Sequence, residues 1–195
     1  MNSSFIVGID EAGRGPLAGP VSVGVVVVNS KINKKFFKGI RDSKKLSEKK
    51  REEWFERAVV MKKSGILDYK VALVSEKIID RKGIVEAIRV GIEDSLKKLK
   101  VSKQSQIYLD GGLKAPKEFK KQKTIIRGDD KVPVISMASI LAKVIRDRYM
   151  IKIAMNYPEY GFEEHKGYGT AKHIRAIKKF NPSKIHRKTY LTNIL

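Results

Sequence analysis

Short apolar segments of the chain are followed by acidic residues at three places. The acids in these positions are Asp10, Glu11, Asp110, Asp129 and Asp130. A carboxylate at the end of a buried strand lies where open α/β sheets place ligand-binding groups. Carboxylates gathered at one edge raise one another's pKa values unless bound cations keep them ionised. We therefore expect Asp10, Glu11, Asp110 and one of Asp129 or Asp130 to converge on divalent cations.

The composition indicates which substrate such a cation site would act on. Lys and Arg number 42 against 21 Asp and Glu in 195 residues, a formal net charge of +21. This excess predicts a polyanionic partner, with nucleic acid as the first candidate. Paired divalent cations on carboxylates are a recurrent device for phosphodiester cleavage, so the sequence favours a nuclease. A non-catalytic basic nucleic-acid-binding protein, in which the acids are structural, stays open as the alternative.

Several classes of site and location are disfavoured by the composition. The chain has no cysteine and three histidines, which leaves oxygen ligands and those histidines for any metal. The N-terminal MNSSF segment has no signal-peptide pattern, and no apolar stretch reaches the length of a membrane span. We expect a single domain over residues 1–195 that is cytoplasmic and monomeric, with no membrane association.

The first two acids adjoin a loop rich in glycine. Consecutive residues of a strand face opposite sides of a sheet, so Asp10 and Glu11 reach one site only if the strand ends or bends near Gly13. A solvated acidic turn is the alternative for this pair. Gly13, Arg14 and Gly15 open a segment whose backbone can approach a phosphate or a sugar closely.

Hydrophobic periodicity predicts alternating strands and helices, and hence an α/β fold. The expected strands cover residues 5–9, 21–28, 66–74, 106–110 and 124–128. The expected helices begin after Ser47, after Gly83, near Pro133 and after Thr170. In the strand at 66–74, we expect Leu67, Tyr69, Val71 and Leu73 to share one face.

The last third of the chain carries further basic residues, a tyrosine and a histidine. The helix after Pro133 carries the basic residues Lys143, Arg146 and Arg148, with Asp147 as a surface ion-pair partner. Tyr168 lies between two glycines, which predicts an exposed ring. His165 is a metal ligand, a proton shuttle or neither. The tail after Asn181 is again basic and includes His186, Arg187 and Lys188.

Five stretches of the chain resemble type 2 ribonuclease H (ribonuclease HII) in order and spacing. They are IDEAGRGPLAGPV, DSKKLS, GDDKVPVISMASILAKVIRDR, HKGYGT and HRKTY, and the resemblance runs from about Val7 to Tyr190. It implies a ribonuclease-H-like fold with a mixed five-stranded sheet flanked by helices. It also implies an endonuclease that acts on RNA in RNA/DNA hybrids and on ribonucleotides embedded in duplex DNA. Such enzymes remove RNA primers and misplaced ribonucleotides.

The resemblance further implies a reaction and a set of site residues. Incision is on the 5′ side of the ribonucleotide, leaves 3′-hydroxyl and 5′-phosphate ends, and uses two Mg²⁺ or Mn²⁺ ions. The metal-binding, catalytic acids would be Asp10, Glu11, Asp110 and Asp129, because the acid of the family directly follows a glycine, here Gly128. Gly13, Arg14 and Gly15 match the loop that reads the ribose 2′-hydroxyl and its phosphate. Tyr168 matches a tyrosine that stacks on the next sugar, and the candidate phosphate contacts are Lys44, Lys45, Lys143 and Lys166.

The chain departs from the family at a few points. Met137 stands where alanine is more usual, which concerns packing, and the acid after Gly128 is doubled. No helical C-terminal extension follows HRKTY, so substrate binding is expected to depend more on the basic surface. Type 3 ribonuclease H is a second alternative, but it normally carries an additional N-terminal domain, for which the position of Asp10 leaves no room.

Overall fold

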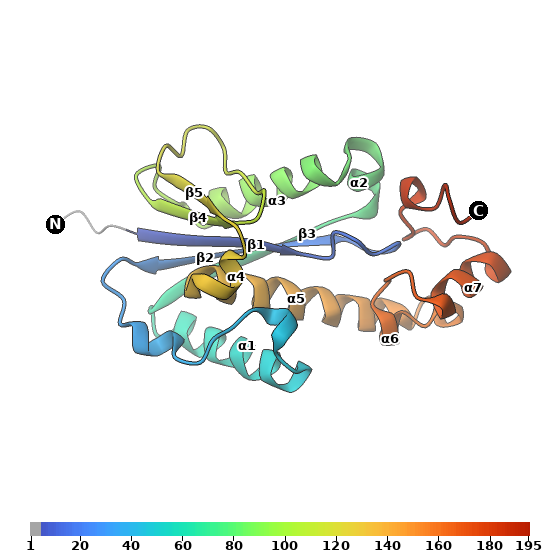
Figure 1. Ribbon diagram of the computed structural model, residues 1–195, viewed down its shortest axis with the longest axis horizontal. Coiled ribbons are helices and arrows are strands. Elements are labelled where there is room, and N and C mark those ends of the chain that lie inside the picture. Colours follow the sequence, from blue (N-terminus) through green and yellow to red (C-terminus); the bar gives the residue numbers. More distant parts are fainter. Residues whose placement is uncertain (1–4) are drawn as a thin grey trace.

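The computed structural model describes residues 5–195, and the first four residues of the MNSSF segment lie outside them. Five strands form one sheet with the order β3-β2-β1-β4-β5 (Figure 1). They are β1 Phe5–Ala12, β2 Val21–Asn29, β3 Leu67–Val74, β4 Gln106–Asp110 and β5 Gln122–Ile125. The α-helices are α1 Glu48–Lys63, α2 Glu76–Lys82, α3 Ile84–Lys98, α4 Gly128–Lys131, α5 Pro133–Ala154, α6 Phe162–His165 and α7 Ala171–Phe180.

The sheet is mixed, as the resemblance implies. β2 pairs antiparallel with β1 and with β3, whereas β4 runs parallel to both β1 and β5. In the β1–β4 register, Ile9 faces Leu109, so the residues that follow, Asp10 and Asp110, lie side by side at the carboxyl ends of two parallel strands. The topology therefore brings together acids that are far apart in the sequence.

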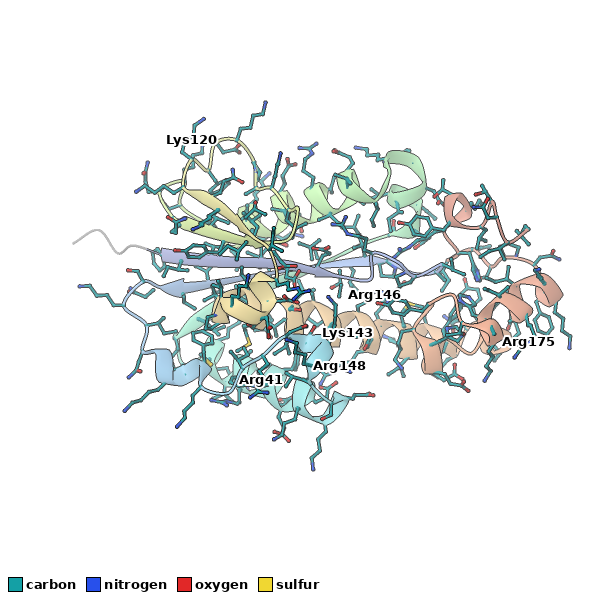
Figure 2. The ribbon with its side chains drawn as sticks, in the orientation of Figure 1. Arg41, Lys120, Lys143, Arg146, Arg148 and Arg175 are labelled. Carbon is teal, nitrogen blue, oxygen red and sulfur yellow. The ribbon has the colours of Figure 1, made fainter. Side chains whose placement is uncertain are left out.

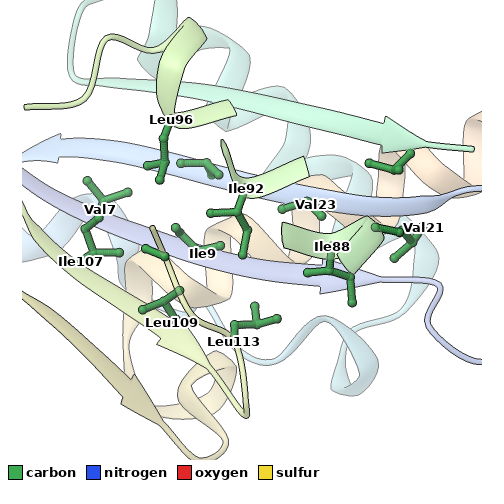
Figure 3. Packing of buried hydrophobic residues seen from close by; sticks show 14 of the residues in the cluster. Val7, Ile9, Val21, Val23, Ile88, Ile92, Leu96, Ile107, Leu109 and Leu113 are labelled. Atoms are coloured by element: carbon green, nitrogen blue, oxygen red, sulfur yellow. The ribbon is translucent and has the colours of Figure 1, made fainter. Parts of the chain in front are cut away.

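One face of the sheet is covered by α3, and Figure 3 shows this packing. Apolar residues three or four positions apart on the helix meet alternate residues of the central strands. The labelled side chains are Val7, Ile9, Val21, Val23, Ile88, Ile92, Leu96, Ile107, Leu109 and Leu113. This core fixes the strands that end in the candidate acids.

The opposite face is covered by α5, with α1 packed beside it (Figure 1). Two glycines let α5 lie directly on the sheet. A Cβ atom at Gly8 would come 2.3 Å from the carbonyl of Val134, and one at Gly24 would come 2.3 Å from the carbonyl oxygen of Ala138. Helix α5 is therefore held in close register with β1, the strand that carries Asp10.

A third cluster of apolar side chains lies where α5 ends. It joins the end of α5 to α6, α7 and the last residues of the chain, at the right of Figure 1. Basic side chains are spread over several sides of the molecule, as the labelled Arg41, Lys120 and Arg175 show (Figure 2). Among the helices in residues 5–195, none combines the length and apolar character that crossing a membrane requires.

One expected strand needs correction, and some short helices were not expected. The fifth strand is Gln122–Ile125 and not 124–128, because Arg127 takes a left-handed backbone with φ of 55° and ends the extended run. In β3, Leu67, Tyr69 and Val71 pack against the same apolar cluster, as the predicted shared face requires, and Leu73 at the end of that face is exposed. The short helices α2, α4 and α6 were not predicted. The helices α1, α3, α5 and α7 follow the expected positions, with Ser47 and Thr170 as N-caps.

Candidate active site

Asp10 is nearly fully buried near the end of β1, with 4% of its surface exposed. Its Oδ1 accepts a hydrogen bond of 2.7 Å from the backbone N–H of Glu11. Ser139 on α5 acts on this carboxyl group in the direction that lowers the pKa of Asp10. Ser139 Oγ is in turn 2.9 Å from Oγ of Ser43, a residue of the DSKKLS segment. Groups from β1, from α5 and, indirectly, from the segment before α1 thus surround the carboxylate of Asp10.

Asp110 and Asp129 complete a group of three aspartates. Carboxylate oxygens of Asp10, Asp110 and Asp129 all lie within 4.8 Å of one another. Asp110 ends β4 and accepts a 2.6 Å hydrogen bond from the N–H of Gly128. Asp129 lies in α4 and not at a strand end as expected, and this short helix carries it over the end of β4. The group brings together three of the four predicted acids.

The surroundings disfavour ionisation of these acids. Burial, followed by the charge of Glu11, raises the pKa of Asp10 well above its ordinary value. Burial, followed by the charges of Asp110 and Asp42, raises the pKa of Asp129 to about 6. A positive charge bound among the three carboxylates would reverse both effects.

Glu11 lies outside this group, contrary to the expectation that all four acids converge. β1 continues through Ala12, which pairs with Ser22 of β2, so the regular alternation of side chains is kept past the acids. Glu11 therefore leaves the face of Asp10, and its Oε1 lies 3.0 Å from Nε of Arg14. The expected bend before Gly13 does not occur in the chain as described.

Lys44 and Lys45 lie beside two of the acids, Asp129 and Asp130. Lys44 Nζ is 4.0 Å from a carboxylate oxygen of Asp129. Partial burial opposes the charge of Lys44, but the carboxylates of Asp129 and Asp42 outweigh it, and the pKa of Lys44 is raised. Lys45 forms a 2.5 Å ion pair with Asp130. These groups line a cavity of about 420 Å³ whose walls are Asp42, Lys44, Lys45, Asp110, Arg127, Asp129 and Asp130.

Asp130 differs from its neighbour Asp129 in every respect that concerns metal binding. Its ion pair with Lys45 lowers its pKa, and its side chain is 37% exposed, whereas the side chain of Asp129 is 7% exposed. Among residues 5–195, the three-aspartate group includes Asp129 and not Asp130. The geometry accordingly favours Asp129 as the candidate ligand.

A buried arginine supports the loop between β1 and β2, residues 13–20, which we call the glycine loop. Gly13 has a φ of 85°, a left-handed conformation that favours glycine. Arg187 donates hydrogen bonds of 2.7 Å to the carbonyl of Gly13 and of 2.8 Å to that of Arg14. Gly15 has open space around its Cα. The side of the loop that faces away from Arg187 is therefore not covered at Gly15.

Tyr168 is 41% exposed, as expected from the glycines on either side. Nζ of Lys143 lies 5.7 Å from the centre of its ring, and the same lysine pairs with Asp147 at 2.9 Å. Lys166 directs its ammonium group to the backbone carbonyl of Glu163 and away from the three aspartates. Lys143 therefore lies beside Tyr168, whereas the ammonium group of Lys166 bonds the backbone of α6.

Several polar residues of the last third of the chain are buried. Arg146 and Arg187 have no exposed surface, and His186 is 1% exposed. His165 is not isolated: its ring stacks on that of His173, with ring centres 4.4 Å apart. In the part of the chain that is described, no histidine belongs to the three-aspartate group. Sequence reasoning missed these buried groups because charge ordinarily indicates exposure.

The chain is similar to known proteins over nearly its whole length. Residues 7–193 match the family described as ribonuclease HII. The ribonuclease HII of Caldicellulosiruptor bescii is 47% identical over 191 residues, which are 98% of this chain and 88% of that protein. The crystal structure of the ribonuclease H2 from Pyrococcus horikoshii OT3 is 30% identical, with a TM-score of 0.73 and coverage of 97% of this chain and 96% of that chain.

A second solved structure has the same fold. The structure of the PCNA:RNase HII complex from Archaeoglobus fulgidus gives a TM-score of 0.76 at 26% identity, with 97% of this chain and 96% of that chain covered. The expected ribonuclease-H-like fold is confirmed by these neighbours. Neither the binding-protein alternative nor the type 3 alternative is supported. The chain belongs to the ribonuclease HII family, the endoribonucleases that act on the RNA strand of RNA/DNA hybrids.

Proposed function

We propose that Asp10, Asp110 and Asp129 hold the divalent cations of this endoribonuclease, and that Glu11 joins them when cations are bound. One observation carries the proposal: carboxylate oxygens of the three aspartates lie within 4.8 Å of one another in a buried setting. An oxygen-only donor set fits a hard cation such as Mg²⁺ or Mn²⁺. Two such ions supply an activated water and stabilisation of the leaving oxygen, which yields 3′-hydroxyl and 5′-phosphate ends.

The chain's own groups would keep the carboxylates oriented for this role. The N–H of Glu11 fixes one aspartate, Asp10. The N–H of Gly128 fixes a second, Asp110. Carboxylates restrained in this way lose little conformational freedom on binding a cation. Arginine and lysine at the cavity mouth would draw the phosphate backbone toward them.

We also propose that the enzyme incises on the 5′ side of ribonucleotides embedded in duplex DNA. The backbone at Gly13, Arg14 and Gly15 is open on its outer side and offers N–H donors to a 2′-hydroxyl and its phosphate. The exposed ring of Tyr168 is available to stack on the sugar that follows. The support is the position of this ring beside the glycine loop: the N–H of Leu17 donates to the carbonyl of Gly167 at 2.8 Å.

The lysines would contribute unequally. Lys44 and Lys45 lie at the cavity with the acids and are the best placed for phosphate contacts. Lys143 lies by Tyr168, where it would reach the phosphate next to the stacked sugar. Lys166 would take part only after its ammonium group leaves the carbonyl of Glu163.

The remaining parts of the proposal concern the whole protein. It would act as one domain and as a monomer in the cytoplasm, on RNA/DNA hybrids and on ribonucleotide-containing duplex DNA. Its roles there would be the removal of ribonucleotides from DNA and of RNA primers. This part of the proposal is supported by the match to ribonuclease HII proteins over 98% of this chain.

The test is cleavage of two end-labelled substrates, a DNA duplex with one ribonucleotide and a continuous RNA/DNA hybrid. Each is incubated with Mg²⁺, with Mn²⁺ and with a chelator. We expect incision of the first immediately 5′ to the ribonucleotide, with a product end that ligase and polymerase accept as a 3′-hydroxyl. If only the continuous hybrid is cut, the proposed recognition of embedded ribonucleotides is contradicted. If cleavage continues in chelator, the proposed metal site is contradicted.

A further inference from the structure

Two arginines that have no part in the three-aspartate group lie fully buried beneath the glycine loop. Arg146 on α5 and Arg187 near the C-terminus both have 0% exposed surface. Among residues 5–195, neither forms an ion pair with a carboxylate, and the nearby Asp147 pairs with Lys143 instead. Buried charges without a counter-ion are costly, so these two need another explanation than stability.

The two guanidinium groups are satisfied by backbone carbonyls. Arg146 donates to Pro20, Lys166 and Ala18 at 2.9, 3.0 and 3.2 Å. Arg187 donates to the carbonyls of Gly13, Arg14 and Gly19 at 2.7, 2.8 and 3.0 Å, respectively. All but one of these acceptors belong to the loop between β1 and β2. The planar fork of arginine suits such a set of carbonyls, because each of its N–H groups has a fixed direction.

The direction of these carbonyls sets the direction of the amides that follow them. No cis peptide bond occurs among the described residues. In a trans peptide the C=O and the next N–H point in opposite directions. Since the carbonyls of Gly13 and Arg14 point inward to Arg187, the N–H groups of Arg14 and Gly15 point outward. Within residues 5–195, neither N–H has a protein acceptor.

The same arginines join the loop to the segment that carries Tyr168. Arg146 bonds the carbonyl of Lys166, and its guanidinium carbon lies 5.8 Å from the centre of the Tyr168 ring. A Cβ atom at Gly13 would lie 2.0 Å from Nε of Arg146, so the loop rests directly on this side chain. In Figure 2, Arg146 lies between α5 and the sheet, whereas Arg148 of the same helix lies on the side of α1.

We propose that Arg146 and Arg187 are positioning residues for ribonucleotide recognition. They turn the amides of Arg14 and Gly15 toward the substrate and hold the glycine loop and the Tyr168 segment as one rigid unit. Their two charges add a positive potential below the amides, which favours a phosphate above them. This inference rests on the proposed recognition of ribonucleotides embedded in duplex DNA. It adds that the recognition depends on two side chains that do not themselves touch the substrate.

The test compares binding to two DNA duplexes of one sequence, with and without a single ribonucleotide. Dissociation constants are measured by fluorescence anisotropy with Ca²⁺ in place of Mg²⁺, which is intended to slow turnover. The variant is Arg187→Lys, which keeps the charge but cannot direct three N–H groups to three carbonyls. The matched control is Arg148→Lys, an exposed arginine paired with Glu52.

We expect the preference of the wild-type chain for the ribonucleotide duplex to fall about tenfold or more in Arg187→Lys. Affinity for the all-DNA duplex and the control variant should change little. In Mg²⁺, KM for the ribonucleotide duplex should rise while kcat on a continuous hybrid is largely kept, because the aspartates are untouched. A folded Arg187→Lys with the wild-type preference would overturn the inference alone. A wild-type chain without any preference would overturn the proposed recognition of embedded ribonucleotides and the inference with it.

Two further variants cover the case in which Arg187→Lys does not fold. Tyr190→Phe removes a hydroxyl that donates to the carbonyl of Arg14 at 3.2 Å. Gly13→Ala keeps both arginine side chains, but its methyl group would lie 2.0 Å from Nε of Arg146, so that the loop or this side chain must shift. Each should reduce the preference for the ribonucleotide duplex, Gly13→Ala more than Tyr190→Phe. Unchanged preference in both folded variants would contradict the role of the arginines.

Discussion

His186 donates a hydrogen bond from Nε2 to Nε2 of His173 across 3.0 Å. The direction follows from the partners of the other ring nitrogens. Nδ1 of His186 accepts from the N–H of Ser183, so the proton of this ring is on Nε2. Nδ1 of His173 donates to the carbonyl of Tyr168, so its Nε2 is free to accept. The pair is therefore neutral, and it anchors the backbone of Tyr168.

Acidification should destabilise the protein through this pair. Burial lowers the pKa of both His173 and His186 to about 4, below the ordinary value of 6.5. The unfolded chain then binds protons between pH 6.5 and 4 that the folded chain does not, so stability is kept above pH 6.5 and lost as the pH falls toward 4. We expect a loss of roughly 2–3 kcal/mol between pH 6.5 and 5, measured by urea unfolding.

The contribution of the pair is isolated with His186→Gln, whose amide can still accept from Ser183. This variant should lose less stability over the same pH range than the wild type. His165 faces the pair through its stacking on His173, so His165→Gln serves as the comparison for the third ring. Equal pH dependence in wild type and His186→Gln would show that the pair is not the cause.

Asp10→Asn should uncouple stability from divalent cations. In chelator at pH 7.5, the buried carboxylate of Asp10 opposes folding, since its pKa is raised by burial and by Glu11. The variant should therefore melt no lower than the wild type without metal. Mg²⁺ at millimolar concentration should raise the Tm of the wild type by a few degrees, about 2–4 °C per kcal/mol of binding, and leave that of the variant unchanged. An equal rise in both would contradict metal binding at Asp10.

Changes at Tyr168 should separate stacking from hydrogen bonding. Tyr168→Phe keeps the ring and should change cleavage of a duplex with one ribonucleotide only modestly. Tyr168→Ala removes the ring and should reduce kcat/KM on that substrate by about tenfold to a hundredfold, the range expected for one stacked base or sugar. The measurement is steady-state cleavage, with Tyr157→Ala as a control in the C-terminal cluster. Full activity of Tyr168→Ala would remove this residue from the site.

Gly8→Ala should strongly destabilise the fold. The added methyl group would lie 2.3 Å from the carbonyl of Val134, so α5 would have to move away from β1. The expected cost is about 2–3 kcal/mol in urea unfolding, as for other overpacked cores. Gly112→Ala is the matched control, because nothing lies within 4 Å of a Cβ atom there. Similar stability of the two variants would contradict the close packing of α5 on the sheet.

Much of the fold could be predicted because its central elements have strong patterns. The apolar runs of β1, β2 and β4 have no competing interpretation, and the long helix α5 shows regular apolar positions after Pro133. Asp10 and Asp110 follow from the same runs, since acids at the ends of neighbouring parallel strands must meet. The local sequence therefore fixes both the strands and two of the acids.

The remaining features depend on contacts between distant segments. β5 is a polar edge strand, and Ile126, which appeared to belong to it, is 76% exposed. The position of Glu11 depends on how far β1 stays paired with β2, which no local pattern reveals. Burial of Arg146 and Arg187 requires backbone carbonyls supplied by a loop more than a hundred residues away. Composition alone predicts such residues at the surface.

The central claim is that three aspartates form the metal centre, and the adjacent pair Asp129 and Asp130 tests it most directly. Single-turnover cleavage of a duplex with one ribonucleotide is measured in Mg²⁺ for Asp129→Asn and Asp130→Asn, with substrate affinity determined in parallel. Asp129→Asn should lose at least a thousandfold in rate while still binding the duplex, because removal of a metal ligand affects the chemical step. Asp130→Asn, which removes only the exposed ion pair with Lys45, should stay within about threefold of the wild type. The reverse order, or two equally active variants, would contradict the assignment.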